Sequence, residues 1–177
     1  MDPRIDREAL DDLFAATYEE LRRLASTVSR GDSAGVSPTT LVNEAWMKLA
    51  ASRPFRSTSR LHFKRIAARA MRQVLVEAAR RRHAAKRGGD DAIFVTFDES
   101  AEHAASTAAE LLALNVALDD LARIEPRQAA MVESRFFGGL DVAETAALLD
   151  VSEATVLRDW RRAKAWLAAQ IARTRID

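Results

Sequence analysis

Cysteine is absent from this chain of 177 residues. Without thiols the chain forms no disulfide framework, holds no metal through thiolates and performs no cysteine catalysis. Glycine and proline are also scarce, at 6 and 4 residues, which is too few for a fibrous or disordered protein. The three histidines, His62, His83 and His103, are scattered and lack metal-ligand spacing. We therefore expect a globular protein without a metal or any other cofactor.

Long apolar runs and phosphate-binding loops are missing as well. No apolar run approaches the roughly 20 residues that a membrane helix needs, and the acidic N-terminal residues lack the apolar centre of a signal peptide. The chain contains neither Gly-x-x-x-x-Gly-Lys-Ser/Thr nor Gly-x-Gly-x-x-Gly. We expect a soluble, cytoplasmic protein that is not an enzyme, with no membrane partner and no small-molecule substrate.

The formal net charge of +1 hides a local concentration of cations. Between Arg56 and Arg87 there are 11 lysines and arginines and one acidic residue, Glu77. Because phosphate binding depends on local potential, this cluster indicates a nucleic-acid contact more clearly than the overall charge does. The alternative is a basic helix face that is merely solvated.

A second cationic element lies near the C-terminus and has the pattern of a helix-turn-helix. Asp141 and Glu144 have the spacing of a capping box, which begins a short helix. Asp150-Val151-Ser152 interrupts that helix, and Ser152 is a good N-cap for the next one. Two helices joined by such a turn, the second one basic, form the pattern that reads a DNA major groove.

The second of these helices is amphipathic. Its inward positions are Val156, Trp160, Ala163, Leu167 and Ile171, and core packing is the default role of Trp160. We expect the base edges to be read by Glu153, Thr155, Arg158 and Arg162, with Arg161 and Lys164 on phosphates. The alternative is a helical hairpin whose basic face only meets solvent.

The remaining periodicity predicts an all-α fold with two small helical domains. Amphipathic helices are expected at about residues 10–28, 39–50 and 61–83, and further helices begin near Thr107. Residues 88–106 have mixed character and are expected to form a flexible linker. The alternative is that Ile93–Phe97 docks as an extended strand.

Two segments carry a family resemblance. Ser37–Trp46 reads SPTTLVNEAW, and Arg135–Leu167 begins RFFGGL and continues through the helix-turn-helix. With them, nearly the whole chain resembles the extracytoplasmic-function sigma factors of the sigma-70 family. More narrowly, it resembles the subgroup that lacks the acidic motif at the start of the polymerase-binding helix.

The resemblance implies a role for each part of the chain. Residues 1–87 correspond to region 2, which binds the clamp coiled coil of core RNA polymerase and melts the minus-ten element of promoter DNA. Residues 107–177 correspond to region 4, which binds the polymerase flap and reads the minus-thirty-five element. The implied polymerase-binding residues are Leu41, Asn43, Glu44 and Met47. The implied minus-ten contacts are Arg65, Arg69, Arg72, Arg80, Arg81 and Arg82.

Two hydroxyls replace acidic residues that relatives carry at the start of the polymerase-binding helix. Phosphorylation of Thr39 or Thr40 by a Ser/Thr protein kinase would restore about two negative charges at a helix N-terminus, where the helix dipole favours them. The alternative is that Thr39 or Thr40 is a simple N-cap after Pro38 and that polymerase tolerates it.

Two other functions are consistent with parts of the pattern. A helix-turn-helix regulator could bind an operator without joining RNA polymerase, but it would not need the helix at residues 39–49 or the basic helix beside it. A helical adaptor could bind only proteins, which salt-dependent binding to promoter DNA would exclude.

Overall fold

The computed structural model describes residues 3–28, 35–51, 59–85, 95–97, 103–105 and 107–173. Within these ranges the chain forms seven helices and two strands of three residues each, which confirms the all-α fold class. The elements are α1 (Pro3–Val28), α2 (Pro38–Ala51), α3 (Arg60–Ala85), β1 (Val95–Phe97), β2 (His103–Ala105), α4 (Ala108–Ile124), α5 (Pro126–Phe136), α6 (Val142–Leu149) and α7 (Glu153–Arg173). No helix in the described part of the chain is both long and apolar enough to cross a membrane.

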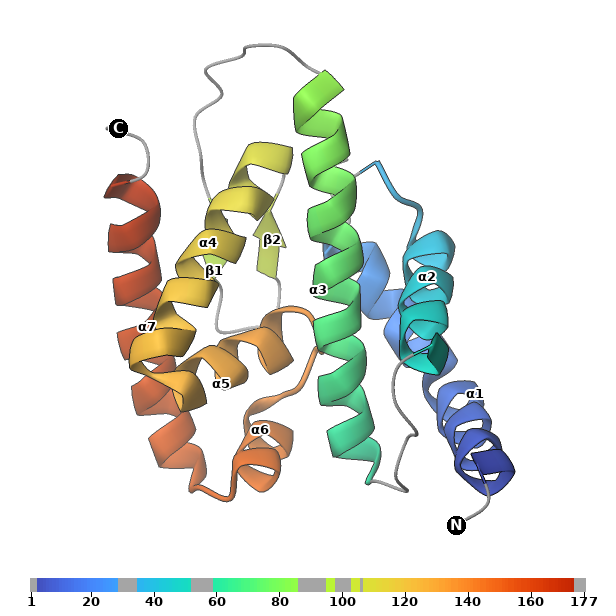
Figure 1. Ribbon diagram of the computed structural model, residues 1–177. Coiled ribbons are helices and arrows are strands. Elements are labelled where there is room, and N and C mark those ends of the chain that lie inside the picture. Colours follow the sequence, from blue (N-terminus) through green and yellow to red (C-terminus); the bar gives the residue numbers. More distant parts are fainter. Residues whose placement is uncertain are drawn as a thin grey trace.

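Helix α3 is the centre of the fold. It runs between α1 and α2 on one side and the C-terminal helices on the other (Figure 1). Helix α3 takes this central position because it carries two adjacent apolar stripes. A helix that is apolar on so much of its surface must pack against other elements on more than one side. The buried residues of α3 include Phe63, Ala67, Ala68, Ala70, Met71, Val74, Leu75, Ala78 and Ala79.

The N-terminal unit consists of α1, α2 and α3. Helix α1 contributes buried Leu10, Leu21 and Ala25 to the core. Between α1 and α2, the rings of Phe14 and Trp46 stack with centroids 4.4 Å apart. These contacts hold one face of α2 against α1 and α3, and the opposite face of α2 meets solvent.

The C-terminal unit consists of α4 to α7. Helix α4 begins with a capping box in which Thr107 and Glu110 satisfy each other's backbone N–H groups. Its core includes Leu114, Phe136 and Trp160, all at most 1% exposed. Helix α5 ends at a turn in which Gly139 adopts φ +61°, a left-handed conformation that favours glycine.

The segment between the two units contains an antiparallel hairpin. Val95 pairs with Ala105 and Phe97 with His103. Strand β2 lies against α1, and both strands lie against α4. The predicted linker segment therefore contains a short hairpin, in which Val95–Phe97 forms the extended strand of the alternative prediction. Ile93 and Phe94, the other apolar residues of that prediction, lie outside the described residues.

The two units pack directly on each other. Helix α3 contacts both α4 and α5, and Gly138 and Gly139 in the turn after α5 lie against Ala68 and Leu24 of the N-terminal unit. A Cβ atom at Gly138 would lie 3.0 Å from Cβ of Ala68 on α3 and would collide with the carbonyl oxygen of Ser134 in its own unit. One built on Gly139 would lie 3.0 Å from Cδ1 of Leu24 on α1. The glycine pair thus permits a close approach that a larger residue would prevent.

Candidate nucleic-acid interface

Helices α6 and α7 form the helix-turn-helix that the sequence predicts. The side chain of Asp141 accepts a hydrogen bond from the backbone N–H of Glu144 at 2.7 Å, and Glu144 accepts one from the backbone N–H of Asp141 at 3.1 Å. Asp150 turns the chain with a left-handed backbone (φ 53°). Ser152 then caps α7 by accepting from the backbone N–H of Thr155 at 3.2 Å. The predicted capping box and N-cap are both confirmed.

The inner face of α7 is anchored in the C-terminal core. All five predicted inward residues, Val156, Trp160, Ala163, Leu167 and Ile171, are buried. The Trp160 ring also lies under the guanidinium of Arg135, 4.3 Å from the ring centre to Cζ. Core packing of Trp160 is therefore confirmed, and α7 is fixed in rotation about its axis.

The outer face of α7 presents the predicted DNA contacts. Glu153, Arg158, Arg161 and Arg162 are exposed, and Thr155 and Lys164 are half-buried. The Thr155 hydroxyl lies 2.9 Å from that of Ser152, which orients it at the start of the helix. A cationic face on a rigidly packed helix, beginning just after a tight turn, is the geometry that inserts into a major groove.

Asp159 sets the electrostatics beside Arg158. This aspartate is buried, with its carboxylate 2.8 Å from Nη2 of Arg127 on α5 and 3.8 Å from Nε of Arg158. The Arg158 side chain is 56% exposed, so its guanidinium meets solvent. The aspartate pairs with α5 and leaves the arginine available at the surface.

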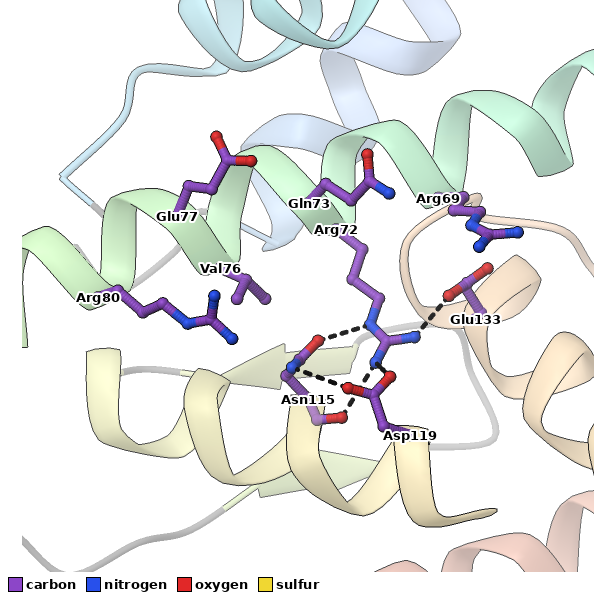
Figure 2. A pocket seen from close by; sticks show the side chains of 9 residues that line it. All are labelled: Arg69, Arg72, Gln73, Val76, Glu77, Arg80, Asn115, Asp119 and Glu133. Carbon is purple, nitrogen blue, oxygen red and sulfur yellow. Dashed lines mark hydrogen bonds and ion pairs between the residues drawn. The ribbon is translucent and has the colours of Figure 1, made fainter. Parts of the chain in front are cut away.

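The predicted minus-ten arginines on α3 do not all lie in the same environment. Arg69, Arg80 and Arg81 are exposed, and Arg65 and Arg82 are half-buried. Arg72 instead points toward the C-terminal unit, where it contacts Asn115, Asp119 and Glu133 (Figure 2). These contacts border a cavity of about 250 Å³ between α3, α4 and α5. The complete lining is Arg69, Arg72, Gln73, Val76, Glu77, Arg80, Asn115, Asp119 and Glu133.

Lys64 is an important residue that the sequence argument missed. Its side chain is 1% exposed, and its Nζ donates to Glu20 on α1 at 2.7 Å and to Glu144 on α6 at 2.8 Å. It joins the N-terminal unit to the capping box of the helix-turn-helix. The spacing of Lys64 could have indicated its burial. It stands four residues before Ala68 and eleven before Leu75, and therefore lies on the apolar stripe that they form.

The cations around Glu20 lower the pKa of its carboxyl group. Desolvation acts to raise the pKa of Glu20, but hydrogen bonds from Lys64 and Arg60 outweigh it and hold that pKa below its ordinary value of 4.5. The same hydrogen bond from Arg60 raises the pKa of its guanidinium. The carboxylate thus stays ionised beside a buried ammonium group.

The start of α2 has a defined cap and two exposed hydroxyls. Ser37 is the N-cap: its Oγ accepts from the backbone N–H of Thr40 at 3.1 Å, and Pro38 occupies the first helical position. The alternative in which Thr39 or Thr40 caps the helix is therefore wrong. Both threonines are exposed, and the Thr40 hydroxyl lies 2.8 Å from Ser37 Oγ.

The predicted polymerase-binding residues divide between core and surface. Leu41 is completely buried, so it supports α2 from within. Asn43 and Glu44 are exposed, and Met47 is 68% exposed. With Thr40, these three residues follow the spacing i, i+3, i+4 and i+7, which places them on one outward stripe of α2.

Two helical units with a helix-turn-helix and a basic central helix define a DNA-binding protein of the transcription machinery. The family model described as ECF sigma factor matches residues 5–173, and the chain belongs to this family. The family implies core RNA polymerase and promoter DNA as partners, in transcription initiation. No curated protein and no solved structure matches the chain. Within the described residues, no group of three or more His, Cys, Asp or Glu could hold a metal ion.

Proposed function

We propose that this sigma factor directs RNA polymerase to promoters in the cytoplasm, with α1–α3 acting as region 2 and α4–α7 as region 4. The observation that carries the proposal is the outer face of α7, where Arg158, Arg161 and Arg162 stand exposed directly after a capped turn. Arg158 and Arg162 read bases of the minus-thirty-five element, together with Glu153 and Thr155. Arg161 and Lys164 contact phosphates.

Run-off transcription tests this function. Core RNA polymerase is combined with the purified protein and a library of promoter fragments, and the transcripts are sequenced. We expect defined start sites only when the protein is present. DNA binding without any polymerase-dependent transcript would instead support a regulator that acts alone.

We further propose that α2 is the polymerase-binding helix and that threonine phosphorylation activates it. Helix α2 has no acidic residue in its first turn, so its N-terminal dipole has no negative partner there. Thr39 and Thr40 are exposed, and Thr40 shares its stripe with Asn43, Glu44 and Met47. A phosphate on either threonine adds about two negative charges beside Glu44, on the face offered to a basic polymerase surface.

Acidic replacements test the switch. Thr39→Glu, Thr40→Glu and the double variant should bind core polymerase more tightly than the unmodified protein. The gain should be incomplete, because glutamate carries one charge where phosphate carries about two. It should also shrink as salt is raised, since the contact is largely electrostatic. The measurement is polymerase affinity by fluorescence anisotropy at low and moderate salt.

The matched controls are Thr39→Ala and Thr40→Ala. Because Ser37 and not a threonine caps α2, both variants should melt close to the wild-type temperature while failing to respond to a kinase. Tight polymerase binding by the unmodified wild type, equal to that of the acidic variants, would exclude the switch.

A further inference from the structure

The side of α3 that carries four of the six proposed minus-ten contacts faces the protein's own C-terminal unit. Arg65, Arg69, Arg72 and Arg80 recur at helical spacing and therefore lie along one side of α3. Three of them, Arg69, Arg72 and Arg80, line the cavity against α4 and α5. Figure 2 shows the Arg72 side chain directed across this cavity toward α4. Arg69 and Arg80 remain exposed, but a DNA phosphate cannot reach Arg72 while α4 and α5 hold its guanidinium.

Arg72 is held by a set of contacts that we call the arginine clasp, formed with Asn115, Asp119 and Glu133. Nε donates to the Asn115 side-chain oxygen at 3.0 Å, and Nη1 donates to Glu133 at 2.6 Å. Nη2 donates to Asp119 at 2.7 Å and to the Asn115 carbonyl at 3.0 Å. With its side chain only 12% exposed, Arg72 has most of its donors committed to the C-terminal unit.

A second tie supports the closed arrangement at the other end of the interface. Buried Lys64 bridges Glu20 of the N-terminal unit and Glu144 of α6. Nearby, a Cβ atom at Gly138 would lie only 3.0 Å from Cβ of Ala68 on α3, so the two units pack closely here. The interface is therefore both packed and charge-paired, and breaking it leaves Lys64 with one carboxylate fewer.

The closed arrangement is incompatible with simultaneous contact at both promoter elements. Elements centred ten and thirty-five base pairs from the start site lie about 85 Å apart along B-DNA, at about 3.4 Å per base pair. In the structure, however, α3 and α4 are joined by the 2.7 Å contact between Arg72 and Asp119. The hairpin of β1 and β2 further shortens the connection between the units. Promoter binding thus requires the units to separate.

We infer that the arginine clasp is an autoinhibitory latch, in which Asp119 and Glu133 stand in for DNA phosphates on Arg72 until the two units separate. The inference rests on the proposed sigma-factor function, since it assigns Arg72 and its side of α3 to promoter DNA. Closure lowers the apparent affinity for DNA by the fraction of molecules that are open. Loss of the clasp carboxylates raises that fraction.

The test uses the full chain with the double substitution Asp119→Asn and Glu133→Gln. Both changes keep the side-chain shape and lie on α4 and α5, away from the outer face of α7. Because the chain has no cysteine, Arg22→Cys on α1 and Ala169→Cys on α7, both at exposed positions, accept a fluorophore pair without side reactions. Energy transfer between the dyes reports closure, and anisotropy with a labelled duplex of arbitrary sequence reports DNA binding.

We expect a lower energy transfer in the double variant and about tenfold tighter DNA binding than in the wild type. The slope of log affinity against log salt should become steeper by about 1, because the released Arg72 neutralises an additional phosphate. Asp120→Asn is the control for the loss of one negative charge from α4. It removes the same charge from α4, but Asp120 contacts Arg123 and Gln170 and not Arg72.

Glu144→Gln provides a second, milder variant, because glutamine also serves in a capping box while it removes the charge partner of Lys64. It should shift energy transfer and DNA affinity in the same direction. Low energy transfer in the wild type, which would mean that the two units are already apart, would overturn the latch. It would also be overturned if the double variant opened without binding DNA more tightly, or if Asp120→Asn gained as much DNA affinity as the double variant. Absence of run-off transcription with these results intact would contradict the sigma-factor function alone.

Discussion

Single arginines on α7 differ in what lies beside them, and this determines their proposed roles. Arg158 stands next to buried Asp159, which pairs with Arg127 and fixes the local backbone and charge. Arg161 is exposed, with no acidic partner among the described ion pairs. Side chains near the start of the recognition helix lie nearest base edges, which favours base reading by Arg158.

Alanine substitutions should separate these roles. Arg158→Ala should cost about 1–3 kcal/mol at the cognate minus-thirty-five element and relax base preference there. Arg161→Ala should weaken binding to all sequences alike and reduce the salt slope by about 1. Binding titrations against a set of single-base variants of the promoter measure both effects. Unchanged affinity and preference in Arg158→Ala would exclude base reading by this residue.

Glu20 gives the N-terminal unit an acid-sensitive contribution to stability. Its pKa is depressed in the folded state, so the stabilisation is complete above the ordinary pKa of 4.5. It is lost as the pH falls through the lowered folded pKa. The Glu20 side chain is 41% exposed, so solvent screening moderates the effect.

Thermal melts between neutral and acidic pH test this contribution. The Glu20→Gln variant should melt at a lower temperature than the wild type at neutral pH, and the difference should narrow below about pH 4.5. Glu19→Gln changes an exposed neighbour on the same helix and should follow the wild-type curve. A constant difference across the whole pH range would show that ionised Glu20 does not stabilise the fold.

At the scale of the elements, the sequence predicted what depends on local spacing. The capping pair Asp141 and Glu144, the cap at Ser152 and the inward face of α7 are set by residues within two turns of each other, and all were correct. Helix bounds also agreed to within a few residues, except that α1 begins at Pro3 and not near residue 10. Local physical chemistry is sufficient for these features.

Contacts between elements that are distant in the sequence could not be predicted from local spacing. Arg72 looked like any other cation on a basic helix, because its partners lie on α4 and α5. Lys64 lies on an apolar stripe, and its charge is tolerated there because it pairs with Glu20 and Glu144, which lie on other helices. The two apolar stripes of α3 did carry information, since one of them required a cover that α1 and α2 do not supply.

At the scale of the whole molecule, one surface has two competing occupants. In the proposed latch, the C-terminal unit pairs with Arg72 of α3 in the free protein, and promoter DNA would replace it in the transcription complex. The hairpin contacts both units, because β1 and β2 lie against α4 while β2 also lies against α1. Separation of the units must therefore disturb the hairpin.

Proteolysis of the hairpin reports this separation without any DNA or polymerase. Chymotrypsin cleaves after aromatic residues, and Phe97 pairs with His103 in the hairpin. A paired strand resists a protease because cleavage needs locally unfolded backbone. We expect slow cleavage after Phe97 in the wild type and several-fold faster cleavage in the Asp119→Asn, Glu133→Gln variant, measured by mass spectrometry of timed digests. The Asp120→Asn control should match the wild type. Equal rates in all three proteins would show that the hairpin does not depend on the arginine clasp, and that the two units can part without disturbing it.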